Sequence, residues 1–304
     1  MFNLEKKRWQ WAALLLLAFV WGASFILMKR GLDAFSYVQI GAIRIFFSFI
    51  ILLPISIKNL KLITRKNFGY LLASGLLGNF FPAFLFPLAE TEVTSSLAGI
   101  LNGLTPFFTL IVGVLAFKNK PGKLQYVGVF VGFIGASILV TNGSFNSLGD
   151  INLYSLLIVF ATFMYGINAN IIRNKLVGLT GVQITSLLFF LVGPFAGVVL
   201  MFTDIQTAYQ SIHFWPSLLA VLTLSTFASV ILLFIYNNLI HSAGAIFASS
   251  STYIIPFFAL MWGLLDNEHI STIHLYSLLI ILAGVYLSSL RRTPYFGFLR
   301  NLFR

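Results

Sequence analysis

The stretch that decides the fold is WQWAALLLLAFVWGASFILM, residues 9–28, which follows the basic cluster Lys6-Lys7-Arg8 and precedes Lys29-Arg30. None of its residues is charged. A helix needs about 20 apolar residues to cross the hydrocarbon core of a bilayer. A cleaved signal peptide has a shorter apolar core of roughly 7–15 residues and a small-residue cleavage site. We therefore expect this stretch to be a retained transmembrane helix.

Composition extends this interpretation to the whole chain. Of the 304 residues, 59% are hydrophobic and only 9% are charged, and the mean hydropathy is +0.94. Soluble domains carry about 25% charged residues, so most of this surface must face lipid. The absence of cysteine excludes disulfides, thiolate metal sites and cysteine nucleophiles. The net charge of +11 resides in short loops, which indicates a topology signal rather than nucleic-acid binding.

Ten segments are long and apolar enough to span a membrane, and the links between them are short. We expect an all-α integral membrane fold of ten transmembrane helices around a central cavity. The predicted spans are 9–29, 37–57, 67–89, 94–117, 125–142, 151–172, 182–202, 215–237, 244–265 and 272–290.

The charges between these spans predict the orientation. With the N-terminus inside, 16 of the 19 basic residues fall in inside segments, whereas seven of the eight acidic residues fall outside. Such an asymmetry follows the positive-inside rule. We expect a multi-pass protein of the cell (inner) membrane with both termini in the cytoplasm.

An internal repeat divides the chain. A shift of 150 residues places Thr105-Pro106-Phe107-Phe108 on Ile255-Pro256-Phe257-Phe258, and a shift of 144 places Trp21-Gly22 on Tyr165-Gly166. We therefore expect two similar five-helix repeats, residues 1–145 and 146–304, in one membrane domain.

Because five is odd, the second repeat should enter the membrane inverted relative to the first. Inverted repeats give two near-equivalent arrangements, open to opposite sides, with a binding site between them. The exchange of Lys118 for Glu268 at equivalent positions fits this inversion, since one would lie inside and the other outside. Duplication can also be a mere route to a large membrane protein, but the pattern favours a transporter.

These features resemble the ten-helix EamA-type branch of the drug/metabolite transporter superfamily. The resemblance is carried by Val20-Trp21-Gly22-Ala23-Ser24-Phe25 with Lys29, by Arg44, and by the segment from Gly244 through Pro256 towards Glu268, and it covers nearly the whole chain. It implies a two-fold bundle with a central cavity and the export or exchange of small metabolites. Small proton-coupled drug exporters of the superfamily use a carboxylate in the first helix. That helix has none here, which weakens the drug-efflux interpretation.

Polar side chains in lipid are costly unless they face a bundle interior or a cavity. Helical spacing puts several of them on shared faces at equivalent positions in both halves. We expect them to line a substrate cavity. The candidates are Trp21, Ser24, Asn79, Asn102, Thr105, Tyr165, Asn168, Ser229, Tyr236, Ser249, Thr252 and Tyr253. Serine and threonine also pack helices and bond to their own backbone, and for each single one we favour that role.

Charged residues and prolines within the spans are candidates for gating. Arg44 lies about two turns into its helix, roughly 10 Å by helical rise. Glu90 or Glu92 could pair with it in a structural clamp, which we favour; the alternative is contact with a substrate carboxylate or phosphate. Pro82, Pro106 and Pro256 can kink their helices, as gates or as static bends.

The favoured function is an alternating-access carrier for a small polar or zwitterionic metabolite, such as an amino acid, acting in export. The alternatives are a translocase for lipid-linked sugars or lipids and a proton-coupled drug efflux pump. An enzyme is not expected, because the four histidines lie at span ends or in loops and no catalytic motif occurs. We expect no cofactor, metal or nucleic acid; the partners are the substrate and the bilayer, and a monomer could suffice.

Overall fold

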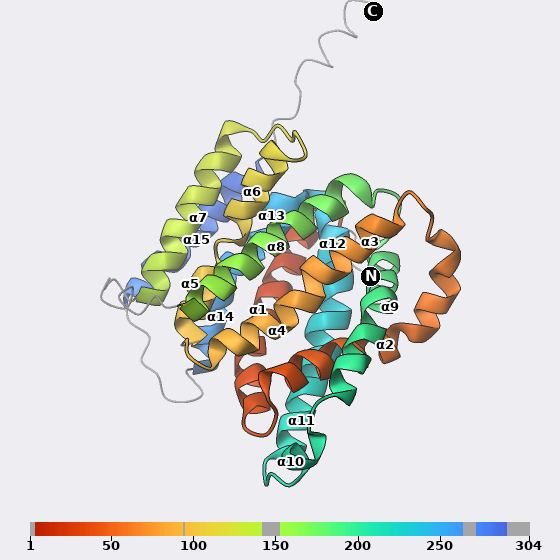
Figure 1. Ribbon diagram of the computed structural model, residues 1–304. Coiled ribbons are helices and arrows are strands. Elements are labelled where there is room, and N and C mark those ends of the chain that lie inside the picture. The colour runs from red at the N-terminus through yellow and green to blue at the C-terminus, as the bar shows by residue number, and fades with distance from the viewer. Residues whose placement is uncertain (1–3, 94, 142–152, 264–271, 291–304) are drawn as a thin grey trace, which may run out of the picture.

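A computed structural model of the protein describes residues 4–93, 95–141, 153–263 and 272–290. The described residues form helices and turns, with no strand among them. Figure 1 shows the helices bundled side by side, most of them running at moderate angles to one another. The fold is therefore all-α, as expected.

Six helical stretches are long and apolar enough to cross a membrane. Four are single helices or a helix with a short extension, and two contain a central π-helical segment. They are α1 (Lys7–Leu32); α2 (Tyr37–Asn59) with η1 (Leu60–Leu62); α3 (Phe68–Gly75), η2 (Leu76–Phe80) and α4 (Phe81–Glu90); α8 (Leu153–Lys175); α9 (Gly181–Met201); and α11 (Phe214–Thr223), η4 (Leu224–Ile231) and α12 (Leu232–Ala243).

Shorter helices occupy the remaining four expected spans. They are α5 (Ser95–Asn102) with α6 (Thr105–Leu115), α7 (Lys123–Thr141), α13 (Ala245–Ser249) with α14 (Ser251–Gly263), and α15 (Thr272–Ser289). A short helix, α10 (Ile205–Tyr209), lies between α9 and α11. Two expected spans, 94–117 and 244–265, are thus each divided into two helices. The first division fits Pro106 in the first turn of α6, where the missing N–H costs no helical bond.

The same capping device starts α2 and α9, at positions 144 residues apart. The Ser36 hydroxyl accepts from the Gln39 backbone while the Gln39 side chain accepts from the Ser36 backbone. Thr180 and Gln183 repeat both bonds at the start of α9. Such a capping box satisfies two otherwise unpaired N–H groups at a helix start. The two helices therefore begin with the same local structure.

Helices at equivalent positions pack against each other. α2 lies along α9, and α7 lies along α15 (Figure 1). The second contact depends on Gly284, because a Cβ there would collide with the backbone N and Cα of Gly132. The two backbones can approach closely because neither residue has a side chain, as is common between helices in membranes.

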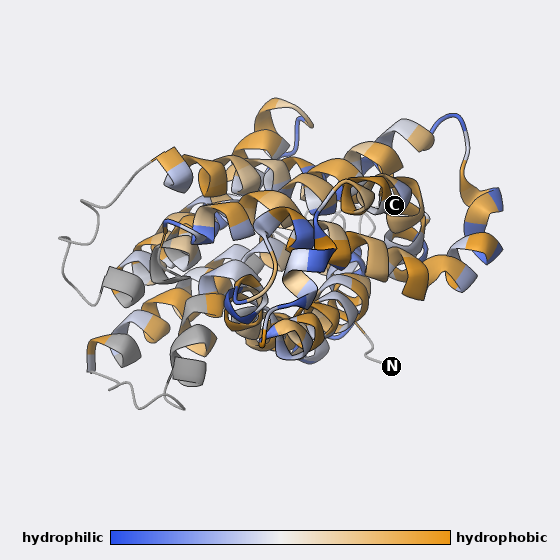
Figure 2. Cartoon of the chain, turned by 60° about the horizontal axis from the view of Figure 1, so that its bottom comes forward, coloured by the Kyte–Doolittle hydropathy of each residue, from blue (hydrophilic) through white to orange (hydrophobic). Residues whose placement is uncertain are grey.

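Apolar side chains also cover the outside of the bundle. Figure 2 shows hydrophobic residues over most of the described ribbon. Large apolar side chains project outward from different helices: Leu115, Phe130, Phe160, Phe195, Leu219, Tyr276 and Leu279. Many polar side chains are buried instead. An outer surface with this many exposed large apolar side chains is suited to lipid.

Candidate substrate site

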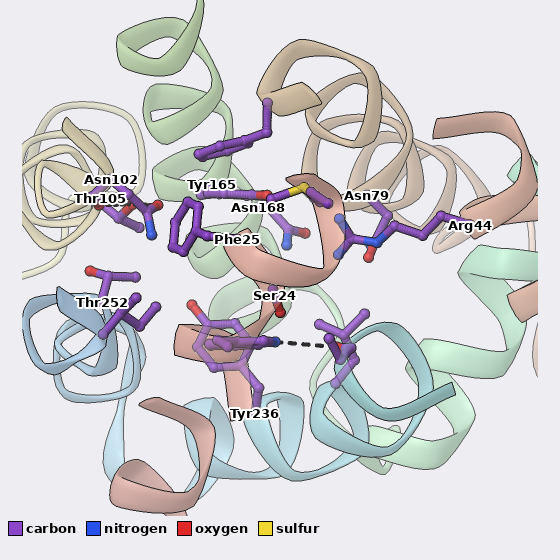
Figure 3. Close-up of a pocket in the computed structure, with 17 residues that line it drawn as sticks. Ser24, Phe25, Arg44, Asn79, Asn102, Thr105, Tyr165, Asn168, Tyr236 and Thr252 are labelled. Atoms are coloured by element: carbon purple, nitrogen blue, oxygen red, sulfur yellow. Dashed lines mark hydrogen bonds between the residues drawn. The ribbon is translucent and has the colours of Figure 1, made fainter. Parts of the chain in front are cut away.

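A cavity of about 110 Å³ lies in the middle of the bundle, between residues from both halves of the chain (Figure 3). Its walls come from α1, α2, η2, α4, α5, α6, α8, η4, α12 and α14. The lining residues are Trp21, Ser24, Phe25, Met28, Arg44, Gly78, Asn79, Phe86, Asn102, Thr105, Tyr165, Asn168, Ala228, Leu233, Tyr236, Thr252 and Ile255. Arg44 and Asn79 enter from one side, and Asn102, Thr105 and Thr252 from the opposite side (Figure 3).

The structure brings together nine of the twelve residues that the sequence proposes for a cavity. Ser229, Ser249 and Tyr253 do not line it. Tyr253 turns away and donates its hydroxyl to the carbonyl of Val129 in α7, at 2.7 Å. Ser249 donates to Ile246 in its own helix. Tyr253 therefore serves the packing of α14 against α7, and the Ser249 hydroxyl is satisfied within α13.

Two pairs of aromatic rings at the cavity are related by the repeat. The rings of Trp21 and Tyr236 meet edge to face, with centroids 5.3 Å apart. Phe86 and Tyr165 stack with centroids 5.9 Å apart. Tyr165 is the counterpart of Trp21 by the 144-residue shift, and Phe86 is the counterpart of Tyr236 by the 150-residue shift. Each half thus supplies one ring to each pair.

In each half, one helix beside the cavity contains a π-helical segment. The segments η2 and η4 are π-helical turns, and they contain Gly78 and Ala228, which are 150 residues apart and both line the cavity. In η4 the N–H of Leu232 bonds to Phe227, five residues back, instead of to Ala228. The Trp21 indole N–H donates to the Ala228 carbonyl at 3.2 Å (Figure 3). π-helical turns are rare and occur frequently at functional sites.

In the first half, Pro82 follows the π-helical turn. It lies in the first turn of α4 and has no N–H to donate to the carbonyl of Gly78, four residues earlier. Gly78 also contacts the second half, because a Cβ at this position would collide with the side-chain amide of Asn168. Among the proposed gating prolines, Pro106 starts α6, whereas the side chain of Pro256 lies outside the described residues.

Most hydroxyl groups of the lining bond to the nearby backbone. Ser24 donates to Val20 within α1, whereas Thr105 donates to Asn102 at the end of α5 and Thr252 to Ser249 at the end of α13, in each case to a backbone carbonyl three or four residues earlier. These three hydroxyls therefore bond to the local backbone and also face the cavity. The polar groups left for a ligand belong mainly to amides, phenols and one guanidinium.

Arg44 supplies that guanidinium, and its partner differs from the one expected. Its Nε donates to the hydroxyl of Ser229 at 2.7 Å, in the π-helical turn of the other half. The expected ion pair is wrong, because neither Glu90 nor Glu92 lies within ion-pair distance of Arg44 in the described part of the chain. The Glu90 carboxylate is buried and has no hydrogen-bond partner among the described residues, and it does not line the cavity.

A second cavity, of about 650 Å³, opens at the end of the bundle that holds the loop between α6 and α7. Lys120, Lys123 and Arg173 line it, together with several amide side chains. Asn170 also lines this cavity; its Nδ2 donates to the Thr109 carbonyl at 2.8 Å and its Oδ1 accepts from Asn119 at 3.0 Å. Thr109 lies one helical turn after Thr105, and Thr105 lines the central cavity.

Comparison with known proteins identifies the architecture. A profile of the EamA-like transporter family matches the chain twice, over residues 9–141 and 152–290. The chain belongs to the EamA-like transporter family. Membership of the drug/metabolite transporter superfamily follows, and the resemblance seen in the sequence motifs is confirmed.

Individual EamA-like relatives agree with this assignment. The Escherichia coli K12 protein YedA, named an uncharacterised inner membrane transporter, is 28% identical over 91% of this chain and 90% of its own length. A Salmonella typhimurium protein named a probable amino-acid metabolite efflux pump is 24% identical, over 41% of each chain. A solved protein crystal structure superimposes with a TM-score of 0.67, covering 92% of this chain and 95% of its own at 12% identity, which shows a shared fold.

The sequence interpretation missed the apolar part of the EamA-like cavity. Phe25, Met28, Leu233 and Ile255 line it without any polar atom to mark them. Gly78 and Ala228 could have been predicted as lining residues, since both are small and occupy equivalent positions in the repeat.

Proposed function

We propose that this transporter is an alternating-access carrier that exports a small polar metabolite, such as an amino acid or a derivative, across the cytoplasmic membrane. In this account its ten spans form two inverted five-helix repeats, residues 1–145 and 146–304. The observation that carries the proposal is the exchange of aromatic partners, Trp21 with Tyr236 and Tyr165 with Phe86, around one central cavity. Such a two-fold arrangement permits the same contacts to open towards either side.

The lining of the cavity supports the substrate class. Aromatic rings and the amides of Asn79, Asn102 and Asn168 provide a surface for a small solute with both apolar and polar parts. No Asp or Glu lines the cavity in the part of the chain that the structure describes, which argues against an organic cation. The similarity to a protein named an amino-acid metabolite efflux pump points to the same class.

The distribution of basic residues supports the orientation. The end of the bundle with Lys118, Lys120 and Lys123 is cytoplasmic if basic loops face inward. The larger second cavity then opens to the cytoplasm, where an exporter takes up its substrate.

Counterflow in proteoliposomes tests the proposal. Vesicles loaded with an unlabelled amino-acid mixture should accumulate labelled amino acid transiently through the wild-type protein. Asn102→Ala, which removes a lining amide, should fold normally and lose most of this flux. Asn59→Ala is the matched control, because Asn59 lies at the end of α2 and lines neither cavity. Absence of counterflow with amino acids, nucleosides, organic acids and sugars would argue for a lipid-linked substrate.

A further inference from the structure

We infer that Arg44 binds an anionic group of the transported substrate, a carboxylate or a phosphate, in the central cavity. This inference rests on the proposed carrier function and specifies the substrate class of its site. It replaces the structural clamp that the sequence favoured, because the carboxylate expected to complete that clamp is not bound to Arg44 in the structure.

The hydrogen bonds of Arg44 leave most of its guanidinium unpaired. A guanidinium has five N–H donors in a planar fork. One of them, on Nε, donates to Ser229, and no other protein acceptor is found for this side chain among the described residues. Ser229 is itself buried in η4, so this bond holds the Nε edge against the other half. The terminal nitrogens then face the cavity, which Arg44 lines (Figure 3).

The positive charge also lacks a counter-ion. Within residues 4–93, 95–141, 153–263 and 272–290, no carboxylate lies within ion-pair distance of Arg44, and none lines the cavity. A cation at this depth in a membrane is costly unless it is paired or hydrated. An anionic ligand supplies the missing charge, and a planar carboxylate or a phosphate can accept two parallel bonds from the guanidinium fork.

The rest of the polar lining offers donors to the same kind of ligand. The side chains of Asn79, Tyr165 and Tyr236 make no hydrogen bond to another protein group in the described structure, so their amide and phenol N–H and O–H groups remain available. The Oδ1 of Asn168 already accepts from Ser74 at 2.5 Å, which leaves its Nδ2 as a donor. A cavity rich in unpaired donors and without acidic groups is complementary to an acceptor-rich anion.

The second cavity points to the same charge independently. Lys120, Lys123 and Arg173 line it, and no acidic residue does so in the described part of the chain. A cleft lined by one sign of charge concentrates ligands of the opposite sign and increases their rate of entry. In the proposed orientation, anions from the cytoplasm would collect there, one helical turn from the central cavity.

The test compares each acid with its uncharged amide on the purified full-length protein. The probes are N-acetyl-leucine against N-acetyl-leucinamide and N-acetyl-phenylalanine against its amide, with glycerol 3-phosphate against glycerol to separate phosphate from carboxylate. Dissociation constants come from thermal-shift titrations in detergent. We expect at least one acid to bind at least tenfold more tightly than its neutral partner.

Variants then assign the charge recognition to Arg44. Arg44→Gln should weaken binding of that acid by about 10- to 100-fold, the effect of losing hydrogen bonds to a charged group, and Arg44→Lys should weaken it less. Arg30→Gln is the matched control, because Arg30 is an exposed arginine paired with Asp33, and it should leave binding within twofold of wild type.

Three results would overturn the inference. The first is equal binding of acids and amides, which needs only the wild-type protein and decides the matter even if Arg44→Gln does not fold. The second is unchanged acid binding in folded Arg44→Gln. In both cases counterflow of other solutes would leave the carrier function standing. The third is counterflow of neither acids nor neutral solutes, which would remove the proposed function and this inference together.

Discussion

The indole N–H of Trp21 donates to the backbone carbonyl of Ala228, 207 residues later in the chain, at 3.2 Å. This bond joins α1 of the first half to the π-helical turn of the second, beside the central cavity. The carbonyl of Ala228 does not receive the N–H of Leu232, because that N–H bonds to Phe227. An aromatic donor from the other half therefore completes the local structure of η4.

Substitution of Trp21 should affect both stability and flux. Trp21→Phe keeps an aromatic ring but removes the bond to Ala228, and we expect the free energy of unfolding to fall by about 1 kcal/mol. Flux in proteoliposomes should fall as well, because the ring packs on Tyr236 in the cavity. Trp215→Phe is the control, since Trp215 is 68% exposed on the outside of α11 and should behave as wild type. Equal effects of the two substitutions would contradict the role of the bond.

A side chain at position 78 should reduce the rate of transport. In Gly78→Ala the added methyl group meets the amide of Asn168, at the contact between the two halves. We expect at least a tenfold loss of counterflow in a protein that still folds. Gly69→Ala, on the same helical stretch with nothing within 4 Å of the new Cβ, should retain wild-type flux. Alanine favours helices over glycine in both variants, so helix propensity cannot explain a loss in Gly78→Ala.

The contact between α7 and α15 should depend on the absence of a side chain at Gly284. In Gly284→Ala the Cβ collides with the backbone of Gly132, which cannot move as a flexible side chain would. We expect a loss of about 1–3 kcal/mol in the free energy of unfolding, measured by thermal unfolding in detergent. Gly122→Ala should cost nothing, because the space around it is open. Unchanged stability of Gly284→Ala would show that the two helices can separate at no cost.

Asn170 should limit access from the second cavity to the central one. Asn170→Ala removes its bonds to Thr109 and Asn119. Since the chain has no cysteine, Thr105→Cys provides a single reporter in the central cavity. We expect an impermeant thiol reagent on the Lys120 side to label it several-fold faster when Asn170→Ala is also present.

The control for this barrier is Asn174→Ala. Asn174 lines the second cavity but bonds only within its own helix, to the Asn170 carbonyl. Labelling at the wild-type rate in the Asn170 variant, or equal acceleration by both variants, would locate the barrier elsewhere.

The features that could be predicted from the sequence are those that depend on residue type and spacing along the chain. Apolar periodicity predicted the helices, and polar positions shared by both halves predicted much of the lining, including Asn102 and Asn168. The π-helical turns at Gly78 and Ala228 were not predictable, because a shift of backbone bonding by one residue depends on groups from distant helices. For the same reason, the sequence did not predict the hydrogen bond from Arg44 to Ser229, 185 residues away, or the inward packing of Tyr253 against α7.

The central claim is that the cavity between the two halves opens alternately to both sides of the membrane. Single-cysteine labelling of Ser24→Cys tests it most directly, because Ser24 lines the cavity and the change is nearly isosteric. In vesicles of known orientation, an impermeant thiol reagent should label this cysteine from either side, and a transported substrate should slow the reaction from both. Labelling from one side only, whatever the substrate, would contradict alternating access at this cavity.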